Sequence, residues 1–189
     1  ASHFEDPSNR KIGSIGKPFG KYEVKILNSK YDECKILEPG QISVKGDPVF
    51  KTYLKKDVKN VFKNGYFLTG DYGYLDSDGY FFFIDRTKDL IIKGGTNISP
   101  NEIDKIINNF QGVTESATIP IYDEFYGEVP YTFIVLDNNF TFNINELTIF
   151  CQKNLGEFKT PIDFEIVKDI PKGPSGKVLK RFLKKNEKK

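Results

Sequence analysis

Apolar and polar residues alternate in short runs over the first part of the chain, a pattern typical of β-strands. Tyr22, Val24 and Ile26 are separated by charged residues, and residues 42–44 repeat the alternation after a Pro-Gly turn. Successive side chains of a strand point to opposite faces, so this spacing predicts half-buried strands. The unbroken apolar run at residues 80–84 predicts a strand that is buried on both faces.

Two further segments of this region carry weaker patterns. Residues 1–20 are rich in glycine and proline, which predicts an irregular approach segment. Residues 54–63 fit a short helix. Because strands dominate the pattern of this region, residues 1–84 are predicted to form a β-rich unit.

The spacing of apolar residues changes to a helical period after Asp85. Ser99, Pro100 and Glu102 combine three helix-start signals, namely an N-cap serine, a proline in the first turn and a glutamate at the third position. Apolar residues follow at the spacing i, i+3, i+4 and i+7, which places one apolar stripe along the helix. The stripe consists of Ile103, Ile106, Ile107 and Phe110.

The remainder of the chain predicts more strands and one more long helix. Strands are expected at residues 90–92, 113–121, 131–136 and 164–166. A helix is expected from Asn143, with Glu146 at the third position, to Gly156. From Val178 the chain is expected to form a basic helix or tail. The order β-α-β-β-α-β-α predicts a small α+β domain over residues 89–189.

Composition and charge narrow the class of protein. The 189 residues carry a net charge of only +2, and no apolar run approaches the ~20 residues that cross a bilayer. His3 is the only histidine, which excludes a histidine-based triad or a multi-histidine metal site. Cys34 and Cys151 are too few for a disulfide framework. We therefore expect a cytoplasmic protein without a metal site, a transmembrane segment or a nucleic-acid partner.

Three short segments carry candidate chemistry. Residues 69–71 (Thr-Gly-Asp) end in a carboxylate, which can accept hydrogen bonds from the two vicinal hydroxyls of a ribose. Residues 85–104 join a charged junction, and hence a possible hinge, to a Gly-Gly loop and a capped helix. Residues 170–177 place Lys177 on a flexible loop, from which a cation can reach a phosphoryl group. Taken singly, each segment also fits a structural role without chemistry. Residues 69–71 fit a turn, residues 85–104 an ordinary strand-loop-helix connection, and Lys177 a solvated surface lysine.

In this order the three segments resemble the adenylate-forming superfamily, which contains acyl-CoA synthetases, the adenylation domains of peptide synthetases, and luciferases. Residues 13–18 and 39–46 are similar to the segments that precede Thr-Gly-Asp in that family, so the resemblance covers nearly the whole chain. It implies the C-terminal part of an enzyme that makes an acyl-AMP from a carboxylic acid and ATP, and then an acyl thioester.

The resemblance implies roles for three residues around the junction. Asp71 would bind the ribose of ATP, and Arg86 would contact the nucleotide. Lys88 would be the hinge about which a mobile C-terminal domain rotates.

It also implies roles for residues beyond the hinge. Lys93, Gly94 and Gly95 would face the active site during thioester formation, with Gly95 leaving room for the pantetheine arm of CoA. Lys177 would enter the site during adenylation and stabilise the reacting carboxylate and the α-phosphate.

The implied organisation is the β-rich end of a large N-terminal domain (1–84), a hinge (85–88) and a C-terminal domain (89–189). ATP, Mg²⁺ and CoA are the implied cofactors and substrates, together with a small carboxylic acid. The Ser/Thr/Gly-rich phosphate loop of the family and its Mg²⁺-holding glutamate are absent from the sequence. We therefore expect that the chain is part of a longer enzyme, that it acts with a missing N-terminal domain, and that it is inactive alone.

Other functions fit the same residues. Residues 88–98 are more similar to CoA ligases than to peptide-synthetase domains, yet an aminoacyl or aryl adenylation domain stays open. A non-catalytic interaction module that retains the fold is a second alternative. The basic end, residues 177–189, fits a solvated helix end better than a nucleic-acid contact. Acetate, fatty acyl and aryl acids all stay open as substrates.

Overall fold

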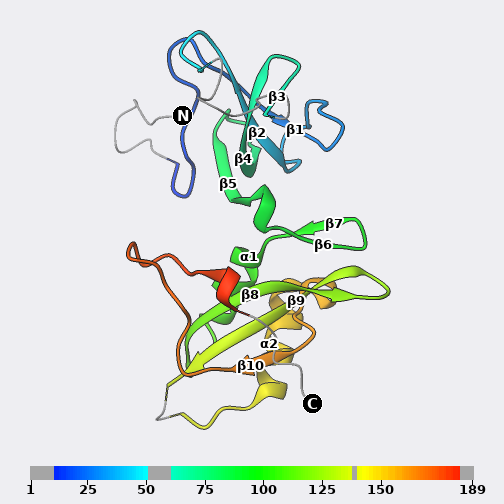
Figure 1. The fold of residues 1–189 in the computed structure, drawn as a ribbon, viewed down its shortest axis with the longest axis vertical. Coiled ribbons are helices and arrows are strands. Elements are labelled where there is room, and N and C mark those ends of the chain that lie inside the picture. Colours follow the sequence, from blue (N-terminus) through cyan, green and yellow to red (C-terminus); the bar gives the residue numbers. More distant parts are fainter. Residues whose placement is uncertain (1–10, 51–60, 138–139, 184–189) are drawn as a thin grey trace. The chain divides into compact units, whose positions relative to one another are not determined.

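The computed structural model describes residues 11–50, 61–137 and 140–183, and the chain divides into two compact units (Figure 1). The first unit is Ala1–Lys88 and the second is Asp89–Lys189. Where it is described, the first unit is built on a β-sheet, whereas the second combines a sheet with two α-helices. The α+β class predicted from the sequence is therefore confirmed.

The sheet of the first unit is antiparallel and has five strands, with β4 (Tyr66–Leu75) as its longest. β4 pairs with β2 (Gly40–Lys45), β3 (Phe62–Lys63) and β5 (Phe81–Arg86). β1 (Glu23–Leu27) extends the sheet beside β2. The strands predicted from alternation around residues 24, 42 and 67 are all present.

Two predictions for this unit are wrong in their details. Phe83 is 42% exposed, whereas Phe81, two positions before it and therefore on the same face of β5, is buried in the core. The core covers this face of β5 at Phe81, beside Ile26 and Ile42, but does not extend to Phe83, so the strand is not buried along its whole length. The helix predicted over residues 54–63 is wrong at its described end, because Phe62–Lys63 pairs with β4, while residues 54–60 lie outside the described residues.

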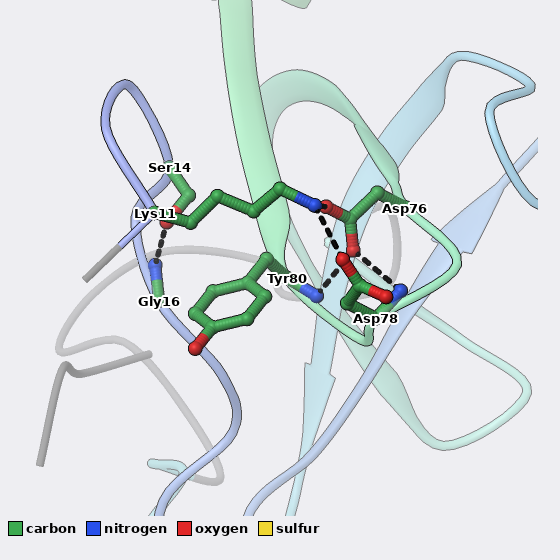
Figure 2. A network of polar contacts seen from close by, with 6 residues as sticks. All are labelled: Lys11, Ser14, Gly16, Asp76, Asp78 and Tyr80. Atoms are coloured by element: carbon green, nitrogen blue, oxygen red, sulfur yellow. Dashed lines mark hydrogen bonds and ion pairs between the residues drawn. The ribbon is translucent and has the colours of Figure 1, made fainter. Parts of the chain in front are cut away.

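A polar network ties the approach segment to the turn between β4 and β5 (Figure 2). The Lys11 ammonium lies 2.5 Å from a carboxylate oxygen of Asp76 and 2.7 Å from one of Asp78. Asp76 Oδ1 also accepts the main-chain N–H groups of Asp78 and Tyr80, which closes the turn. The main chain at Gly16 forms a bridge to β5, so the described part of this segment lies against the sheet there.

The sheet of the second unit is built around β9 (Gly127–Leu136). β8 (Val113–Asp123) forms a long antiparallel hairpin with it, and β10 (Phe164–Ile166) runs parallel to it. β6 (Ile91–Lys93) joins β9 and pairs with β7 (Thr96–Ile98).

Both predicted helices of this unit are present, and their caps are those expected from the sequence. Ser99 Oγ accepts the N–H of Glu102 at the start of α1 (Pro100–Ile107). Asn143 caps α2 (Ile144–Leu155), which ends at a glycine with φ of 79°. The helices pack on the sheet through one apolar core that contains Ile91, Ile98, Ile103, Ile107, Val113, Ile134, Leu147, Cys151 and Phe164.

The second unit differs from its predicted order in two places. The pattern does not predict β7, which exists because Gly94 and Gly95 form the two-residue turn of a β6–β7 hairpin, both with positive φ (52° and 80°). The basic end expected from Val178 contains only a short 3-10 helix, η4 (Lys180–Phe182). Residues 184–189 lie outside the described residues.

Candidate functional site

Asp71 and Arg86 lie directly opposite each other in the β4–β5 register. Arg86 Nη1 is 2.9 Å from Asp71 Oδ1. Thr69 Oγ1 accepts the N–H of Asp71 and donates to the main-chain oxygen of Ile42, so it braces the bend on which Asp71 sits. Gly70 in that bend has φ of 77°, a conformation that glycine adopts without strain.

The Asp71–Arg86 pair is accessible from solvent. The side chain of Asp71 is 32% exposed and that of Arg86 is 47% exposed. A carboxylate accepts hydrogen bonds from hydroxyl groups, and a guanidinium donates them to phosphate oxygens. The structure therefore brings together two predicted nucleotide contacts whose chemistry complements a nucleotide.

Lys88 occupies the boundary between the two units. It is exposed and lies in a short 3-10 helix, η2 (Thr87–Asp89), and the first unit ends at this residue. Asp85 before it and Leu90 after it are both buried. The exposed stretch between these two buried positions is short, and its use as a hinge stays a prediction.

Lys93 lies inside an aromatic cluster. Its side chain is buried, and its Nζ donates to the main-chain oxygen of Phe158 at 2.7 Å. The ammonium lies 5.0 Å from the ring centre of Tyr126 and 4.6 Å from that of Phe158. Burial lowers the pKa of Lys93, although the carboxylates of Asp123 and Glu157 oppose that shift. The lysine expected on the thiol side thus fixes the base of the hairpin from within.

The Gly94-Gly95 turn projects from this cluster. The N–H of Gly94 donates to the main-chain oxygen of Tyr126 at 2.8 Å. A β-carbon added at Gly94 would lie 3.5 Å from the ring of Tyr126 and 3.9 Å from that of Phe158. A β-carbon added at Gly95 would meet nothing within 4 Å. Gly94 therefore packs against the cluster, whereas Gly95 borders open space.

Exposed aromatic rings surround this turn, and the sequence reasoning did not single them out. Phe125 is 84% exposed and contacts Tyr126 edge to face, and Tyr126 contacts Phe158 in the same way. The available signal was the run of aromatic and acidic residues at 122–126, between two predicted strands. Phe158 gave no such signal, because only the fold brings it beside the β8–β9 turn.

Lys177 lies on a hairpin closed by a β-bridge between Lys172 and Val178. We call residues 172–178 the Lys177 hairpin. The N–H of Gly173 donates to the main-chain oxygen of Lys177 at 2.8 Å, and Gly176 has φ of 76°. Within the described residues, the ammonium of Lys177 has no hydrogen-bond or ion-pair partner. The loop predicted to be flexible is thus a closed turn that presents an exposed cation.

The two candidate loops of the second unit lie on different sides of it. In Figure 1 the orange-to-red Lys177 hairpin projects on the side opposite the green β6–β7 hairpin. The structure therefore groups Lys93, Gly94 and Gly95 at one place and Lys177 at another.

In the part of the chain that the structure describes, no three histidine, cysteine, aspartate or glutamate side chains group as metal ligands. Over the same residues, no helix combines the length and apolar character needed to cross a membrane.

Comparison with known proteins identifies this architecture. Residues 102–177 match the family of the AMP-binding enzyme C-terminal domain. Over 178 residues the chain is 38% identical to a 2-succinylbenzoate–CoA ligase of Bacillus licheniformis, an alignment that covers 93% of this chain and 37% of the relative. The chain corresponds to the C-terminal part of an adenylate-forming enzyme.

Other relatives carry related names. The chain is 42% identical over 176 residues to a 2-succinylbenzoate–CoA ligase of Listeria monocytogenes, covering 92% of this chain and 35% of the relative. It is 38% identical over 181 residues to the sulfoacetate–CoA ligase of Cupriavidus necator, covering 94% and 35%. The chain therefore spans little more than a third of the length of the curated relatives that it matches. None of these three names is that of a fatty-acid ligase, so they do not support fatty-acid metabolism.

Solved structures agree with this correspondence. The o-succinylbenzoate CoA synthetase of Bacillus subtilis, in complex with its acyl-adenylate intermediate, matches with a TM-score of 0.81 and 36% identity over 92% of this chain and 36% of that chain. ATP-bound MatB of Rhodopseudomonas palustris matches with a TM-score of 0.82 and 31% identity, covering 93% and 36%.

Proposed function

We propose that the protein carrying this chain is an ATP-dependent acid–CoA ligase. One observation carries the proposal. More than nine-tenths of the chain, including parts of both units, aligns with proteins named as CoA ligases. The candidate residues fit the two half-reactions that such a ligase performs, and we consider each half-reaction in turn.

In the first half-reaction a carboxylate oxygen would attack the α-phosphorus of ATP. A bond from oxygen to phosphorus forms, the bond to the β-phosphate oxygen breaks, and pyrophosphate leaves. Asp71 would hold the ribose hydroxyls while Arg86 contacts the nucleotide. Negative charge develops on the phosphate oxygens, and a preorganised cation such as Lys177 stabilises that charge.

Mg²⁺ would enter this half-reaction with the phosphates of ATP, as part of the substrate. A related structure, the Bacillus subtilis o-succinylbenzoate CoA synthetase, holds ATP together with a magnesium ion. The described residues of this chain offer no cluster of three metal-ligating side chains.

In the second half-reaction the thiol of CoA would attack the acyl carbonyl carbon, and AMP would leave. Gly95 borders open space, so a narrow pantetheine arm could pass close to the main chain there. Tyr126 and Phe158 are partly exposed beside this turn, and aromatic rings can stack with a base such as the adenine of CoA.

The two half-reactions require the second unit to present a different side to the reacting centre in each. The Lys177 hairpin and the Gly94-Gly95 turn lie on opposite sides of one unit, so a rigid unit cannot place both at the same reacting centre (Figure 1). Rotation of the unit about Lys88 would solve this problem, and hinge closure of this kind is a common device of enzymes. We also propose that the protein acts in the cytoplasm, which suits its two free cysteines.

The test is to supply the full-length natural protein with ATP, Mg²⁺, CoA and one acid at a time. The acids are 2-succinylbenzoate, sulfoacetate, a fatty acid, an aryl acid and a set of amino acids. We expect acid-dependent release of AMP together with an acyl-CoA product, and no turnover by this chain alone.

Other outcomes would replace the proposal. Amino-acid-dependent pyrophosphate exchange without a CoA product would indicate an aminoacyl adenylation domain. Absence of both ATP binding and turnover in the full-length protein would indicate a non-catalytic module that keeps the fold.

A further inference from the structure

A buried polar cluster lies behind the Lys177 hairpin, and neither half-reaction above uses it. Asp104 on α1 accepts the hydroxyl of Thr118 on β8 at 2.6 Å, and Thr118 Oγ1 lies 2.8 Å from Thr132 Oγ1 on β9. Lys180, at the start of η4, lies with its ammonium 3.6 Å from Asp104 Oδ2. The cluster therefore connects a helix, two strands and the C-terminal segment.

Lys180 depends on Asp104 for its counter-charge. Its Nζ is buried and has no hydrogen-bond partner among the described residues, since 3.6 Å is an ion-pair contact and too long for a hydrogen bond. Asp104 itself is only 13% exposed. A buried ammonium is costly unless a carboxylate compensates it, so Asp104 determines where Lys180 can lie.

Ionisation of Asp104 is disfavoured in the folded chain even with Lys180 beside it. Burial raises the pKa of Asp104 to about 6, although Lys180 and the hydroxyl of Thr118 oppose the shift. The loss of water around the carboxylate therefore outweighs the gain from pairing. Buried ion pairs of this kind are weak evidence for stability, and fixing geometry is their better attested use.

The geometry that the pair fixes is one leg of the Lys177 hairpin. The chain returns from Lys177 past the bridge to Lys172, and the N–H of Leu179 donates to the main-chain oxygen of Pro171 at 2.8 Å. Lys180 follows immediately. A displacement of Lys180 therefore pulls directly on the leg that carries Lys177.

The other leg is held less firmly. Lys172 pairs with Glu115 on β8 at 2.7 Å, but the Lys172 side chain is 45% exposed, whereas the Lys180 ammonium is buried. An exposed pair is screened by water and contributes little to fixing a position. The buried Asp104–Lys180 pair is therefore the stronger of the two anchors.

We propose that Asp104 and Lys180 are positioning residues for adenylation: their ion pair anchors the returning leg of the Lys177 hairpin on α1 and β8, so that the Lys177 ammonium is held where it can meet the reacting carboxylate and phosphate. The proposal rests on the role proposed for Lys177. Neither Asp104 nor Lys180 need touch a substrate.

The first experiment measures the anchoring itself in the full-length natural protein. Asp104→Asn keeps the shape of the side chain and removes its charge. We expect the N–H groups of Gly173 and Leu179, which are bonded within the hairpin and its base, to exchange with solvent hydrogen about tenfold faster. Lys180→Gln should act in the same direction, and it serves if Asp104→Asn does not fold.

The matched control is Glu102→Gln. Glu102 lies on the same helix and pairs with Lys159 at 2.8 Å, but this pair contacts neither leg of the hairpin. We expect unchanged exchange at Gly173 and Leu179. Equal exchange in the Asp104→Asn and Glu102→Gln proteins would overturn the proposal.

The second experiment separates the half-reactions. We expect Asp104→Asn to slow acyl-AMP formation about 10- to 100-fold, because small misplacements of a catalytic group have effects of this size. Thioester formation from supplied acyl-AMP should be unchanged, and Lys180→Arg, which keeps the charge, should retain most of the adenylation rate. Equal loss of both half-reactions would mean a merely structural role and would overturn the proposal.

Failure of the underlying function is distinguishable from failure of the anchor. If Lys177→Ala leaves acyl-AMP formation intact, the role proposed for Lys177 is wrong. The positioning role of Asp104 and Lys180 in adenylation is then wrong as well. The exchange measurement would then still decide whether Asp104 and Lys180 anchor the hairpin.

Discussion

The Gly94-Gly95 turn and the Lys177 hairpin are the two candidate loops of the second unit, and they are built in opposite ways. The first offers no side chain and is fixed by a main-chain hydrogen bond and by the buried Lys93 beneath it. The second offers a long cationic side chain and is fixed at its base by Lys180.

This difference teaches that one small unit can supply shape at one loop and charge at another. A turn that must leave room is best held by packing, because its neighbours then stay out of the space. A loop that delivers a charge needs a base that is fixed to the rest of the unit. Perturbations of the two loops should therefore affect different half-reactions, and the following changes test that separation.

Loss of the Lys177 cation should have the largest effect. We expect Lys177→Ala to slow acyl-AMP formation by about 10²–10³, the usual cost of removing a preorganised group that stabilises developing charge. Thioester formation from supplied acyl-AMP should be spared. Both rates are measured in the full-length natural protein by pyrophosphate exchange and by thiol consumption.

Lys172→Gln is the control for this change. It removes a cation from the same hairpin, but the pair of Lys172 with Glu115 is exposed and should matter little. A similar loss of adenylation in both variants would show that general positive charge, and not Lys177, is what the hairpin provides.

The anchor of the Lys177 hairpin should respond to pH. The pKa of Asp104 is raised to about 6 in the folded chain, above its unfolded value, so its contribution to stability is present at low pH and is lost as the pH rises through 6. The quantity to compare is the free energy of unfolding of the unsubstituted chain minus that of Asp104→Asn. This difference should be about 2 kcal/mol larger at pH 4 than at pH 7.

Urea unfolding of both chains between pH 4 and pH 7 measures this difference. The comparison between the two chains cancels the titration of other groups, since the chains differ only at Asp104. A difference that is constant with pH would mean that the carboxylate titrates normally, and that the burial argument for the anchor is wrong.

Filling the space at Gly95 should affect the other half-reaction. Asparagine tolerates positive φ better than most residues, so Gly95→Asn should keep the turn while its side chain enters the open space. We expect thioester formation to slow about tenfold through obstruction of the thiol path, with adenylation unchanged.

Gly79→Asn provides the matched control. Gly79 has φ of 82°, and an added β-carbon there also meets nothing within 4 Å, but it lies in the β4–β5 turn. It should leave both rates unchanged. If Gly95→Asn does the same, the open space at Gly95 is not on the path of the thiol.

A change that weakens the unit as a whole should have the smallest effect. Ser99→Ala removes the hydroxyl that accepts the N–H of Glu102, which should lower the free energy of unfolding by about 1 kcal/mol. Both half-reactions should stay equal to those of the unsubstituted enzyme at temperatures where the protein remains folded. A selective loss of one rate would mean that stability and loop position are coupled.

Local signals in the sequence were sufficient for the helices and most strands. Ser99 and Asn143 predicted both helix starts, and Gly156 predicted one helix end, because capping depends on residues only a few positions apart. β7 was missed because only Ile98 of its three residues is apolar and buried, so the segment has no alternation of apolar and polar residues. The exposure of Phe83 was also missed, since a run of aromatic residues does not tell how far along a strand the core extends.

Site residues divide in the same way. The order of the motifs singled out Asp71, Arg86 and Lys177, but their roles stay predictions. Only the structure places Asp71 against Arg86, through the register of β4 and β5. It also places Lys93 among rings from distant segments, where burial replaces the expected exposure to a substrate.

What the sequence by itself determined is both α-helices, most of the strands and the correspondence to an adenylate-forming enzyme, because periodicity, caps and motifs are properties of residues close together in the chain. Only the tertiary structure decided that Lys180 must find its counter-charge on Asp104. That pairing joins residues far apart in the chain, and it arises because the fold removes both from water together.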